Sequence, residues 1–583
     1  MIDSTLNPAE QAAKQAIDHI YACIDKGKNF RLEAGAGAGK TYSLIKALEH
    51  LIEIKGIGLL RQNQQIACIT YTNVACDEIK KRIDSHPSVH VSTIHAFCWL
   101  AIKDFQPYLR RELPTISQWA EILAESGGIG SRTVSYENGY RTVEEDRVSL
   151  HHDDVLALTA KLMEQVKFRT LLSGRYPILL IDEYQDTDKV IANALKTYFL
   201  DTNEGPLIGL FGDHWQKIYG TGCGKIEHPN LEVIGKGANF RSVPAIVECL
   251  NRIRAELPQQ VQDPNAKGFV GVYQTNNWVG IRRTGAHWDG DLPPEVAHNY
   301  LEVLKNQLIE DGWDFAPDKT KILILTHRVL ALEQGYQNIA DIFPYNDAYI
   351  QKQDPHIAFF ADTLEPVCMA YQEKRFGNIF AVLGGRSPAI RTMADKVSWI
   401  NSMNKLMEIR ATGTIGAVLD YLRQTKHPHL LPDSVENREK EFEQYEQSPT
   451  AEEPTSITLL RKLRDVSYKE IISLVQFIDE KTPFSTKHGV KGAEFDNVLV
   501  VFGRGWNQYN FNQFLEWART SIPSDKMDTF ERNRNLFYVT VSRPRKRLAL
   551  LFTQKLTAEA IATLINWFGD TAIHSLEIPS LKR

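Results

Sequence analysis

Short runs of apolar residues alternate along the chain with segments whose apolar residues recur at helical spacing. Unbroken apolar runs are typical of strands that are buried on both faces of a parallel sheet. They predict strands within residues 66–70, 178–181, 206–212, 321–326 and 498–502. We expect two further strands at residues 30–33 and 91–93. The pattern therefore predicts buried parallel strands in both halves of the chain.

Helical spacing of apolar residues predicts the connecting segments. We expect helices that open near Pro8 and that cover residues 44–52, 74–83, 155–163, 245–257, 397–411 and 468–478. Ser242 is a good candidate for the N-cap of the helix at 245–257, with Pro244 in its first turn. Residues 433–453 lack this apolar spacing. They contain eight carboxylates and only two basic residues, and prolines lie at the end of the segment. This composition predicts a solvated loop.

Length and composition set the class of protein. A chain of 583 residues exceeds one hydrophobic core and suggests about three or four domains. The net charge of −5 means that a nucleic-acid partner would need local basic faces. The seven cysteines are scattered singly, which disfavours zinc, iron–sulfur clusters and a disulfide framework. No apolar run approaches the roughly 18 residues of a membrane span, so we expect a cytoplasmic protein without a membrane partner.

A loop of alternating alanine and glycine follows the first predicted strand. It reads Ala34, Gly35, Ala36, Gly37, Ala38, Gly39, Lys40 and Thr41. The glycines permit positive φ and close approach of backbone N–H groups, Lys40 can reach the β- and γ-phosphates, and the Thr41 hydroxyl suits Mg²⁺. Ala34 stands where such loops usually have their first glycine. A flexible loop without a ligand is the alternative, which the strand before it and the helix after it disfavour.

Acidic and amide side chains follow the next buried strands. Asp182 comes first after the run 178–181 and can hold Mg²⁺, while Glu183 can orient the attacking water as a base. Gln216, after the run 206–212, is a candidate sensor of the γ-phosphate. Together with the loop, these residues predict a nucleoside triphosphatase. Near the N-terminus, Gln11 either reads an adenine edge or is an ordinary polar residue at a helix start.

Polar and aromatic side chains also follow the strands at 66–70 and 91–93. These are Tyr71 and Thr72 after the first strand, and Thr93 and His95 at the end of the second. Parallel sheets place ligands at the carboxyl ends of their strands. A single histidine or aromatic residue in such a place is more often part of a core, so this prediction depends on the surrounding motifs.

The motifs occur in a specific order along nearly the whole chain. After the phosphate loop come Thr-Tyr-Thr-Asn at 70–73, Thr-Ile-His-Ala-Phe at 93–97, Asp-Glu-Tyr-Gln-Asp at 182–186, Gly-Asp-x-x-Gln-x-Ile-Tyr at 212–219 and Asn-Phe-Arg-Ser at 239–242. Residues 486–496 look like a fifth motif and residues 534–543 like a sixth. This set resembles the superfamily 1 helicases of the UvrD, Rep and PcrA type, from residue 6 to about residue 551.

The resemblance implies an α/β fold with two RecA-like P-loop NTPase domains, in which parallel sheets are flanked by helices. Each domain would carry a mostly helical insertion. The first motor domain would comprise residues 1–96 and 165–237, with an insertion at 97–164. The second would comprise residues 238–344 and 484–583, with an insertion at 345–483.

The resemblance also implies ATP and Mg²⁺ as cofactors and assigns roles to residues. Lys40, Thr41, Asp182, Glu183 and Gln216 would form one wall of the nucleotide site. Arg241 and Arg543 would act from the other wall as arginine fingers. Gly492 and Glu494 would meet the ribose.

Single-stranded or tailed DNA is the partner that the resemblance implies. The residues at matching DNA-contact positions are Tyr71, Thr72, Thr93, His95, Thr326 and His488. The family generally continues Arg-Trp-Arg-Gly after the tyrosine that corresponds to Tyr219, and this tryptophan stacks on a base. Here Gly220, Thr221, Gly222 and Cys223 stand instead, so the stacking residue is missing from its usual place.

Two activities follow from the resemblance. The first is an ATP-dependent DNA helicase or translocase that moves 3′ to 5′ on single strands. The alternative is a DNA-end-sensing subunit, because compact UvrD-like chains also resemble the helicase-like subunit of the Gabija anti-phage system, which accompanies an OLD-family nuclease. A P-loop kinase or an RNA helicase is disfavoured, because the acidic run 182–186 and the paired arginine motifs suit neither.

Overall fold

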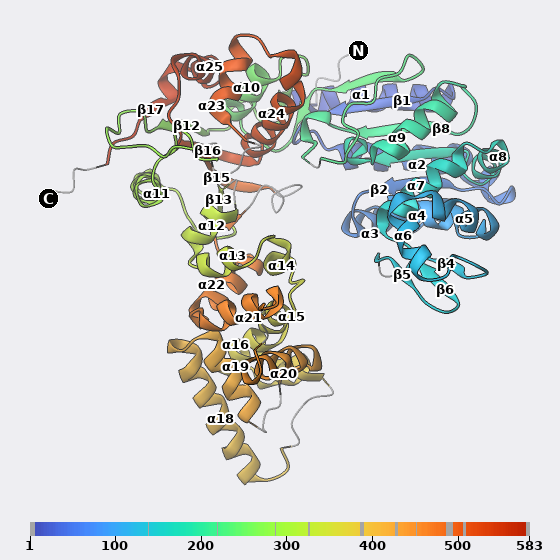
Figure 1. Cartoon of the computed structure of the whole chain (residues 1–583). Helices are drawn as coiled ribbons and strands as arrows, with labels where there is room; N and C mark the ends of the chain where they lie inside the picture. Colours follow the sequence, from blue (N-terminus) through green and yellow to red (C-terminus); the bar gives the residue numbers. More distant parts are fainter. Residues whose placement is uncertain are drawn as a thin grey trace. The chain divides into compact units, whose positions relative to one another are not determined.

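The computed structural model describes residues 6–137, 139–218, 220–285, 287–324, 327–384, 390–425, 430–449, 452–485, 494–504 and 509–578 (Figure 1). The chain separates into two compact units. Unit 1 contains Met1–Val270, Glu516–Arg547 and Ala562–Asp570, and unit 2 contains Gly271–Leu515, Leu548–Ile561 and Thr571–Arg583. Each unit is therefore assembled from segments that are distant in the sequence.

Unit 1 is built on a six-stranded parallel sheet with the order β3-β2-β7-β8-β1-β9. Its strands are β1 (Phe30–Ala34), β2 (Ile66–Thr70), β3 (Val89–Thr93), β7 (Ile178–Asp182), β8 (Leu207–Gly212) and β9 (Glu232–Lys236). The strands predicted in this half of the chain are thus confirmed. Because all six run the same way, their carboxyl ends lie at one edge of the sheet.

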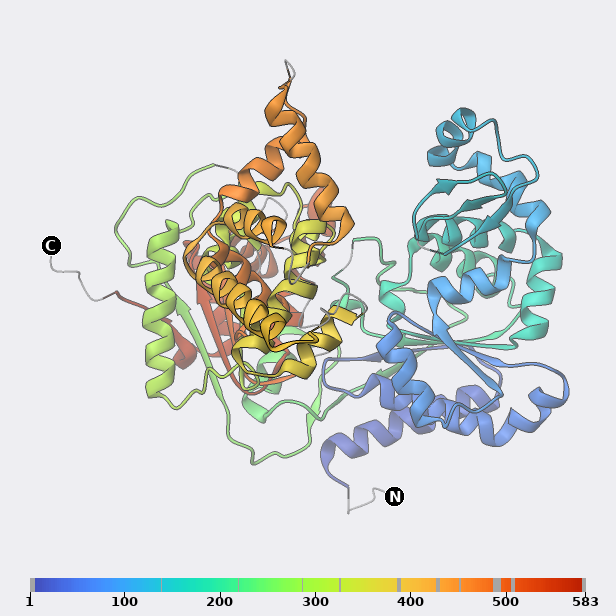
Figure 2. The same cartoon turned by 90° about the horizontal axis from the view of Figure 1, so that it is seen from below.

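Helices cover both faces of this sheet (Figure 2). They include α1 (Pro8–Asp25), α2 (Lys40–Arg61), α3 (Asn73–Arg82), α4 (Ile94–Ile102), α8 (Val166–Arg175) and α9 (Lys189–Leu195). The start of α1 is fixed by a capping box, in which the Asn7 side chain accepts a hydrogen bond from the Glu10 N–H and the Glu10 carboxylate accepts one from the Asn7 N–H. The predicted helix that opens near Pro8 is confirmed.

The segment between α4 and α8 forms a small mixed subdomain. It contains α5 (Gln106–Glu112), α6 (Ser117–Glu125) and α7 (His152–Met163), with a three-stranded sheet of order β4-β6-β5. These strands are β4 (Thr133–Ser135), β5 (Thr142–Val143) and β6 (Arg147–Ser149). The sequence analysis did not predict this sheet, because strands of two or three residues are too short to leave a periodic pattern. Trp119 anchors the subdomain by donating from its buried indole to Asp154 at 2.8 Å.

Segments that follow β9, together with one helix from the C-terminal part of the chain, complete unit 1. These are β10 (Ala238–Asn239), α10 (Pro244–Ile253), β11 (Gln260–Val261) and α24 (Met527–Val541). On α24, the Asn535 amide donates to the carbonyls of His214 and Lys217, both at 3.1 Å. The helix α24 is therefore tied directly to the segment that follows β8.

For α10, the predicted position of Pro244 in the first turn is confirmed, but the predicted N-cap and the predicted C-terminal end were wrong. Val243, not Ser242, is the N-cap residue, and the Ser242 hydroxyl instead donates to the Pro544 carbonyl at 2.7 Å. The helix ends at Ile253, because Arg254 leaves the helical conformation and forms a 2.6 Å ion pair with Asp213. A tertiary partner thus determines each end.

Unit 2 contains most of a second six-stranded sheet, with the order β14-β13-β15-β16-β12-β17. Its strands are β12 (Phe269–Gln274), β13 (Thr320–Ile324), β14 (Phe484–Ser485), β15 (Phe495–Phe502), β16 (Pro544–Phe552) and β17 (Ile573–Ser575). The β13–β14, β13–β15 and β12–β17 pairs are parallel. Helices α11 (Pro294–Glu310), α12 (His327–Gln334), α13 (Gln337–Ile342), α23 (Phe511–Arg519) and α25 (Ala558–Phe568) accompany this sheet.

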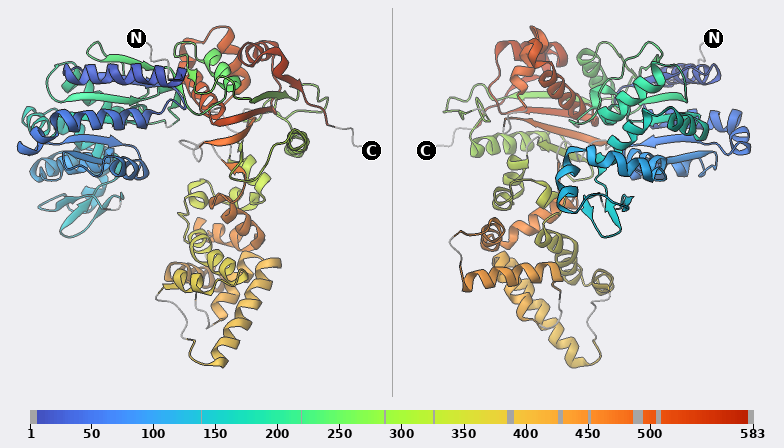
Figure 3. Two further views of the ribbon diagram at one scale, coloured as in Figure 1. Left: turned by 180° about the vertical axis from the view of Figure 1, so that it is seen from behind. Right: turned by 45° about the vertical axis from the view of Figure 1, so that its right-hand side comes forward.

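The insertion between β13 and β14 is helical throughout its described residues (Figure 3). It contains α14 (Asp347–Ile350), α15 (Pro355–Phe359), α16 (Glu365–Gln372), α17 (Phe376–Leu383), α18 (Met393–Thr412), α19 (Ile415–Gln424), α20 (Asp433–Gln447), α21 (Thr455–Asp465) and α22 (Tyr468–Ile478). The helices predicted at 397–411 and 468–478 are confirmed as α18 and α22.

The predicted solvated loop at 433–453 was wrong, because most of it is helix α20. Its acidic residues are not all solvated. Glu439 is fully buried, where it forms an ion pair with Arg464 and lies 3.0 Å from His356 Nε2. Composition could not show that one carboxylate has two tertiary partners. Within the described ranges, no helix is long and apolar enough to cross a membrane.

Candidate nucleotide site and strand-end surface

The loop between β1 and α2 has the geometry of an anion-binding turn. Gly37 and Gly39 have φ of 73° and 71°, and α2 begins at Lys40 directly after Gly39. A Cβ atom on Gly37 would lie 2.8 Å from both Arg241 Cβ and Asn239 Oδ1, so only glycine fits. The first N–H groups of α2 lack helical partners and favour negative charge.

Neighbouring segments fix the conformation of this loop. The Ala36 carbonyl accepts hydrogen bonds from Asn239 Nδ2 at 3.2 Å and from Gln259 Nε2 at 3.0 Å. The Gly37 carbonyl accepts one from the Phe240 N–H at 2.9 Å. Residues that follow β9 therefore hold the loop in place.

Lys40 and Glu183 meet above this loop. Lys40 Nζ lies 3.6 Å from Glu183 Oε2, to which Gln185 Nε2 also donates at 2.6 Å. Glu183 has φ 48° and ψ 46°, a left-handed conformation that costs a residue with a side chain about 1 to 3 kcal/mol. Strain of this kind clusters at functional sites. The surrounding structure therefore holds Glu183 in a conformation that is unfavourable for its own backbone.

Thr41 and Asp182 carry oxygen atoms at the same edge of the sheet. Thr41 lies in the first turn of α2, and Asp182 is the buried last residue of β7. One hydroxyl and one carboxylate beside a phosphate loop form a donor set that fits Mg²⁺, which uses few protein ligands and keeps several waters. The residues present are therefore compatible with this ion.

Gln216 is oriented by charged partners on both sides. Its Nε2 donates to Asp213 Oδ2 at 2.8 Å, and its Oε1 accepts from Arg543 Nη2 at 3.2 Å. The acid fixes which end of the amide is the donor, so the oxygen faces the guanidinium. The structure thus links the residue after β8 to the residue after α24.

The two predicted arginine fingers meet in the same region of unit 1. Arg241 Nη1 donates to the Ser542 carbonyl at 2.9 Å, and Arg543 Nε donates to the Val539 carbonyl at 2.9 Å. Arg543 is almost fully buried. The structure therefore brings together Lys40 with Glu183, Gln216 with Arg543, and Arg241 with the backbone beside Arg543.

Behind these residues lies a buried network that the sequence analysis missed. Arg254 is 2% exposed and pairs with Asp213 at 2.6 Å and with Glu33 at 3.8 Å. Burial is the largest influence on Asp213 and alone would raise its pKa, but Arg254, Lys40 and the hydrogen bond from Gln216 together outweigh burial and hold that pKa below its usual value. No motif marks Arg254. In the sequence it stands inside the helix predicted at 245–257, as an ordinary basic residue.

Glu33, Asp213 and His214 place potential metal ligands within 4.8 Å of one another. They do not form a metal site, because Arg254 contacts both carboxylates and Arg31 adds a 2.9 Å contact to Glu33. Two guanidinium groups already supply the positive charge that a cation would bring.

The predicted DNA-contact residues of unit 1 lie at the carboxyl ends of β2 and β3. Thr72 and Thr93 cap helices α3 and α4, accepting hydrogen bonds from the N–H groups of Ala75 and Ala96. Tyr71 is 40% exposed. The ring of His95 lies 5.3 Å from that of His152, and burial followed by this neighbour lowers the pKa of His95.

The remaining predicted site residues do not lie among the residues described above. Gln11 donates to the Leu6 carbonyl at 2.9 Å, as a polar residue at a helix start does. Glu494 is an exposed residue of unit 2, just before β15. Thr326, His488 and Gly492, together with Tyr219, fall outside the described residues.

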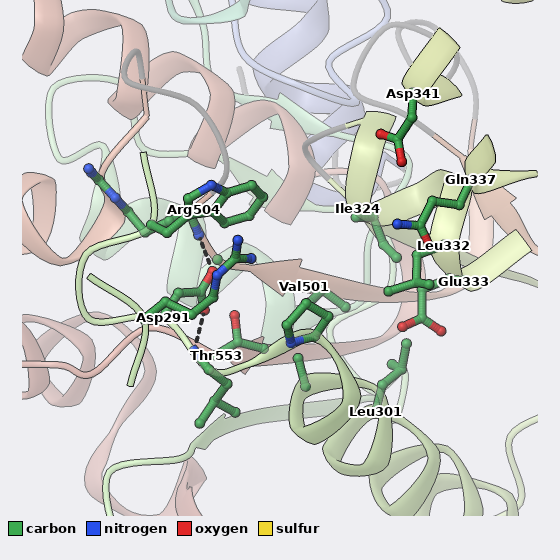
Figure 4. A pocket seen from close by; sticks show the side chains of 16 residues that line it. Asp291, Leu301, Ile324, Leu332, Glu333, Gln337, Asp341, Val501, Arg504 and Thr553 are labelled. Atoms are coloured by element: carbon green, nitrogen blue, oxygen red, sulfur yellow. Dashed lines mark hydrogen bonds between the residues drawn. The ribbon is translucent and has the colours of Figure 1, made fainter. Parts of the chain in front are cut away.

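Unit 2 contains a cavity of about 290 Å³ (Figure 4). Ile324 and Val501, near the carboxyl ends of β13 and β15, lie between two walls. One wall carries Glu333, Gln337 and Asp341; the other carries Asp291, Arg504 and an Arg283 guanidinium stacked 3.5 Å from the Trp288 ring centre. Asp291 accepts from the Arg504 N–H at 2.8 Å, and burial raises the pKa of Asp291. None of the predicted site residues lines this cavity.

Comparison with known protein families agrees with the geometry of the phosphate loop and its neighbouring residues. A model described as an AAA domain matches residues 18–222, and a model described as a UvrD-like helicase C-terminal domain matches residues 418–555. The first match covers the phosphate loop, Glu183 and Gln216. The chain is therefore similar to UvrD-like helicases in both its N-terminal and its C-terminal part.

Individual relatives match over nearly their full length. The chain is 26% identical to the Gabija protein GajB of Bacillus cereus (strain HuB5-5), over 95% of this chain and 97% of that protein. It is 25% identical to the ATP-dependent DNA helicase PcrA of Bacillus subtilis (strain 168), over 94% and 82%. It is 22% identical to the ATP-dependent DNA helicase Rep of Buchnera aphidicola, over 89% and 90%.

Proposed function

We propose that this chain is an ATP-dependent DNA helicase or translocase that couples ATP hydrolysis to 3′-to-5′ movement on single-stranded DNA. One observation carries the proposal. In unit 1, the segments after β1, β7, β8 and β10 and the end of α24 provide an ammonium, a carboxylate, an amide and two guanidinium groups around one loop. This is the set of charges that hydrolysis of a γ-phosphate requires.

Each residue has a defined role in this reaction. The loop from Ala34 to Thr41 binds the phosphates through its N–H groups, and Lys40 neutralises the β- and γ-phosphates. Thr41 and Asp182 would hold Mg²⁺, which supplies further positive charge to the phosphates when bound. Glu183 orients the attacking water and accepts its proton.

Arg241 and Arg543 stabilise the negative charge that develops as the bond to the leaving ADP breaks. Gln216 transmits the state of the site, because its amide contacts Arg543 on one side and Asp213 on the other. The products are ADP and inorganic phosphate, and the released proton passes to solvent through Glu183.

DNA is expected at the carboxyl ends of β2 and β3, on the same sheet edge as the nucleotide. Tyr71 provides an exposed ring for base stacking, and Thr72, Thr93 and His95 provide polar contacts to phosphate. Thr326 and His488 extend this set by motif position, and Gly492 and Glu494 are assigned to the ribose on the same basis.

The test compares ATP turnover and strand separation with single strands, blunt duplex and 3′-tailed duplex. Lys40→Ala should abolish both activities, whereas Lys46→Ala, which removes an exposed lysine of α2 paired with Glu49, should leave them unchanged. Unwinding of the tailed duplex that depends on Lys40 supports the proposal. Absence of DNA-stimulated turnover in the unaltered protein would refute it.

A second function is favoured by the near-complete match to GajB and by the missing stacking tryptophan. In this function the chain is a DNA-end-sensing NTPase subunit that activates an OLD-family nuclease in anti-phage defence. DNA-stimulated ATPase without unwinding, together with co-purification of such a nuclease, would favour the sensor over the motor.

A further inference from the structure

Lys236 is a buried lysine directly beneath the phosphate loop. It is the last residue of β9, paired in register with Ala34 at the end of β1, and its exposed fraction is 0%. Its ammonium donates to the Gly39 carbonyl at 3.0 Å and to Ser43 Oγ at 2.7 Å. The rings of Tyr42 and Phe240 lie at 5.7 and 5.9 Å from Nζ.

Among the described residues, no acidic side chain neutralises this ammonium. In the part of the chain that the structure describes, no carboxylate forms an ion pair with Lys236. The buried guanidinium groups of Arg31 and Arg254, in contrast, each contact at least one. Burial lowers the pKa of Lys236 to about 8, so it remains mostly protonated at neutral pH. A buried charge without a counter-charge is costly, and an anion that binds nearby relieves that cost.

The position of the ammonium connects it to the phosphate site. It binds the oxygen of the peptide group whose N–H belongs to Lys40, at the first turn of α2. A cation on a carbonyl oxygen polarises the peptide group and makes the N–H at its other end a stronger donor. The α2 N-terminus already favours anions, so Lys236 adds to its field from behind.

We propose that Lys236 is a second cation of the phosphate-binding site, which strengthens triphosphate binding through the Gly39–Lys40 peptide group without touching the nucleotide. It is a positioning residue, and the triphosphate supplies the negative charge that its surroundings lack. The inference rests on the proposed ATP binding at this loop.

The decisive variant is Lys236→Met, which keeps an unbranched side chain and removes the charge. It should bind ATP about tenfold more weakly, because the Lys40 N–H loses the cation that polarises its peptide group. KM should rise by a similar factor while kcat at saturating ATP stays within about twofold, since Lys236 does not contact the reacting atoms. Inorganic tripolyphosphate should lose affinity by the same factor, because the effect is on charge and not on the base.

Stability separates this role from a purely structural one. Removing a buried charge that has no acidic partner among the described residues should leave the melting temperature of the nucleotide-free protein unchanged or raise it. A lysine that serves only to hold α2 would give the opposite result, a lower melting temperature. The matched control is Lys46→Met, which also lies near the Tyr42 ring but is exposed and paired with Glu49. It should leave ATP affinity unchanged.

A second variant tests the hydrogen bond alone. Ser43→Ala removes one acceptor but leaves the ammonium in place, so it should weaken ATP binding by less than about threefold. Equal losses in Ser43→Ala and Lys236→Met, or unchanged ATP affinity in Lys236→Met, would overturn the inference. If Lys40→Met also binds ATP normally, the proposed function itself fails. If only Lys40→Met loses binding, the role of Lys236 alone is refuted.

Discussion

Buried charged side chains have different partners around the phosphate loop and in the helical insertion of unit 2. In the insertion, Glu365 is 1% exposed and accepts two hydrogen bonds from Arg410, at 2.5 and 2.8 Å, and one from the Tyr468 hydroxyl at 3.0 Å. Around the loop, Lys236 has no carboxylate within the described residues, and Lys40 and Glu183 stand 3.6 Å apart.

This difference separates buried charges that stabilise the fold from charges that remain available to bind a ligand. Glu365, Arg410 and Tyr468 come from three helices, α16, α18 and α22, and satisfy one another completely. The loop of unit 1 instead combines a strained Glu183 with a cation that the protein does not neutralise. A site that binds a highly charged ligand must keep such charges available. Variants of each region should therefore fail in different assays.

The largest expected effect is on catalysis at Glu183. Glu183→Gln should lower kcat by about 10²- to 10⁴-fold, because an amide cannot accept the proton of the attacking water. ATP binding should persist. Glu183→Gly should lose hydrolysis equally, yet its free energy of unfolding should not fall, since glycine adopts φ 48° without strain. Steady-state turnover and chemical denaturation measure the two effects, and turnover within tenfold of the unaltered protein would contradict the assignment.

Breaking the closed network should affect stability instead. Arg410→Met leaves the buried Glu365 carboxylate without its cation and should lower the free energy of unfolding by about 3 to 5 kcal/mol. ATP turnover at a temperature where the variant is folded should be unchanged. The double variant Arg410→Met with Glu365→Met should recover much of the loss, because no unpaired charge remains. A double variant as unstable as the single one would contradict this account.

Acid should weaken the network behind the nucleotide site. The pKa of Asp213 lies below that of an unfolded aspartate, so its ion pair with Arg254 contributes stability above about pH 4 that is lost as pH falls through the lower, folded value. Asp213→Asn should be less stable at neutral pH, and the difference from the unaltered protein should shrink below about pH 4. Urea unfolding across this range measures the difference, with Asp318→Asn as an exposed control.

The smallest expected effect comes from replacing two threonines that cap helices in the same way. Thr72 caps α3 at the proposed DNA surface, and Thr392 caps α18 in the insertion. Replacing either by alanine should cost about 1 kcal/mol of stability. Only Thr72→Ala should also raise the concentration of single-stranded DNA that gives half-maximal ATPase stimulation. If both variants need the same DNA concentration for half-maximal ATPase stimulation, Thr72 does not contact DNA.

Much of the architecture was predictable because its signals are local. Unbroken apolar runs marked β2, β7 and β8 in one sheet and β13 and β15 in the other, and the glycines of the phosphate loop needed no tertiary information. The errors arose where a distant partner determines the local structure. Ser242 bonds to the Pro544 carbonyl instead of capping α10, and the buried Glu439 belongs to a helix where composition had predicted a loop.

Two charged residues of the site were missed for the same reason. Arg254 and Lys236 match no motif, and along the sequence they are ordinary basic residues. Their importance becomes visible only when the fold places one against Asp213 and the other beneath Gly39. Sequence motifs therefore identified residues expected to contact the nucleotide, but not the buried cations that support them.

The discontinuous make-up of unit 1 has a consequence for how the protein can be divided. The stretch that ends at Val270 lacks α24 and Arg543, although the Arg543 side chain contacts Gln216. A single proteolytic cut near residue 270 would leave both fragments with part of the triphosphate site, and neither expressed alone would rebuild it. Folding of this unit must wait until synthesis has passed residue 570, so a truncated translation product would carry the loop but not the complete hydrolytic machinery.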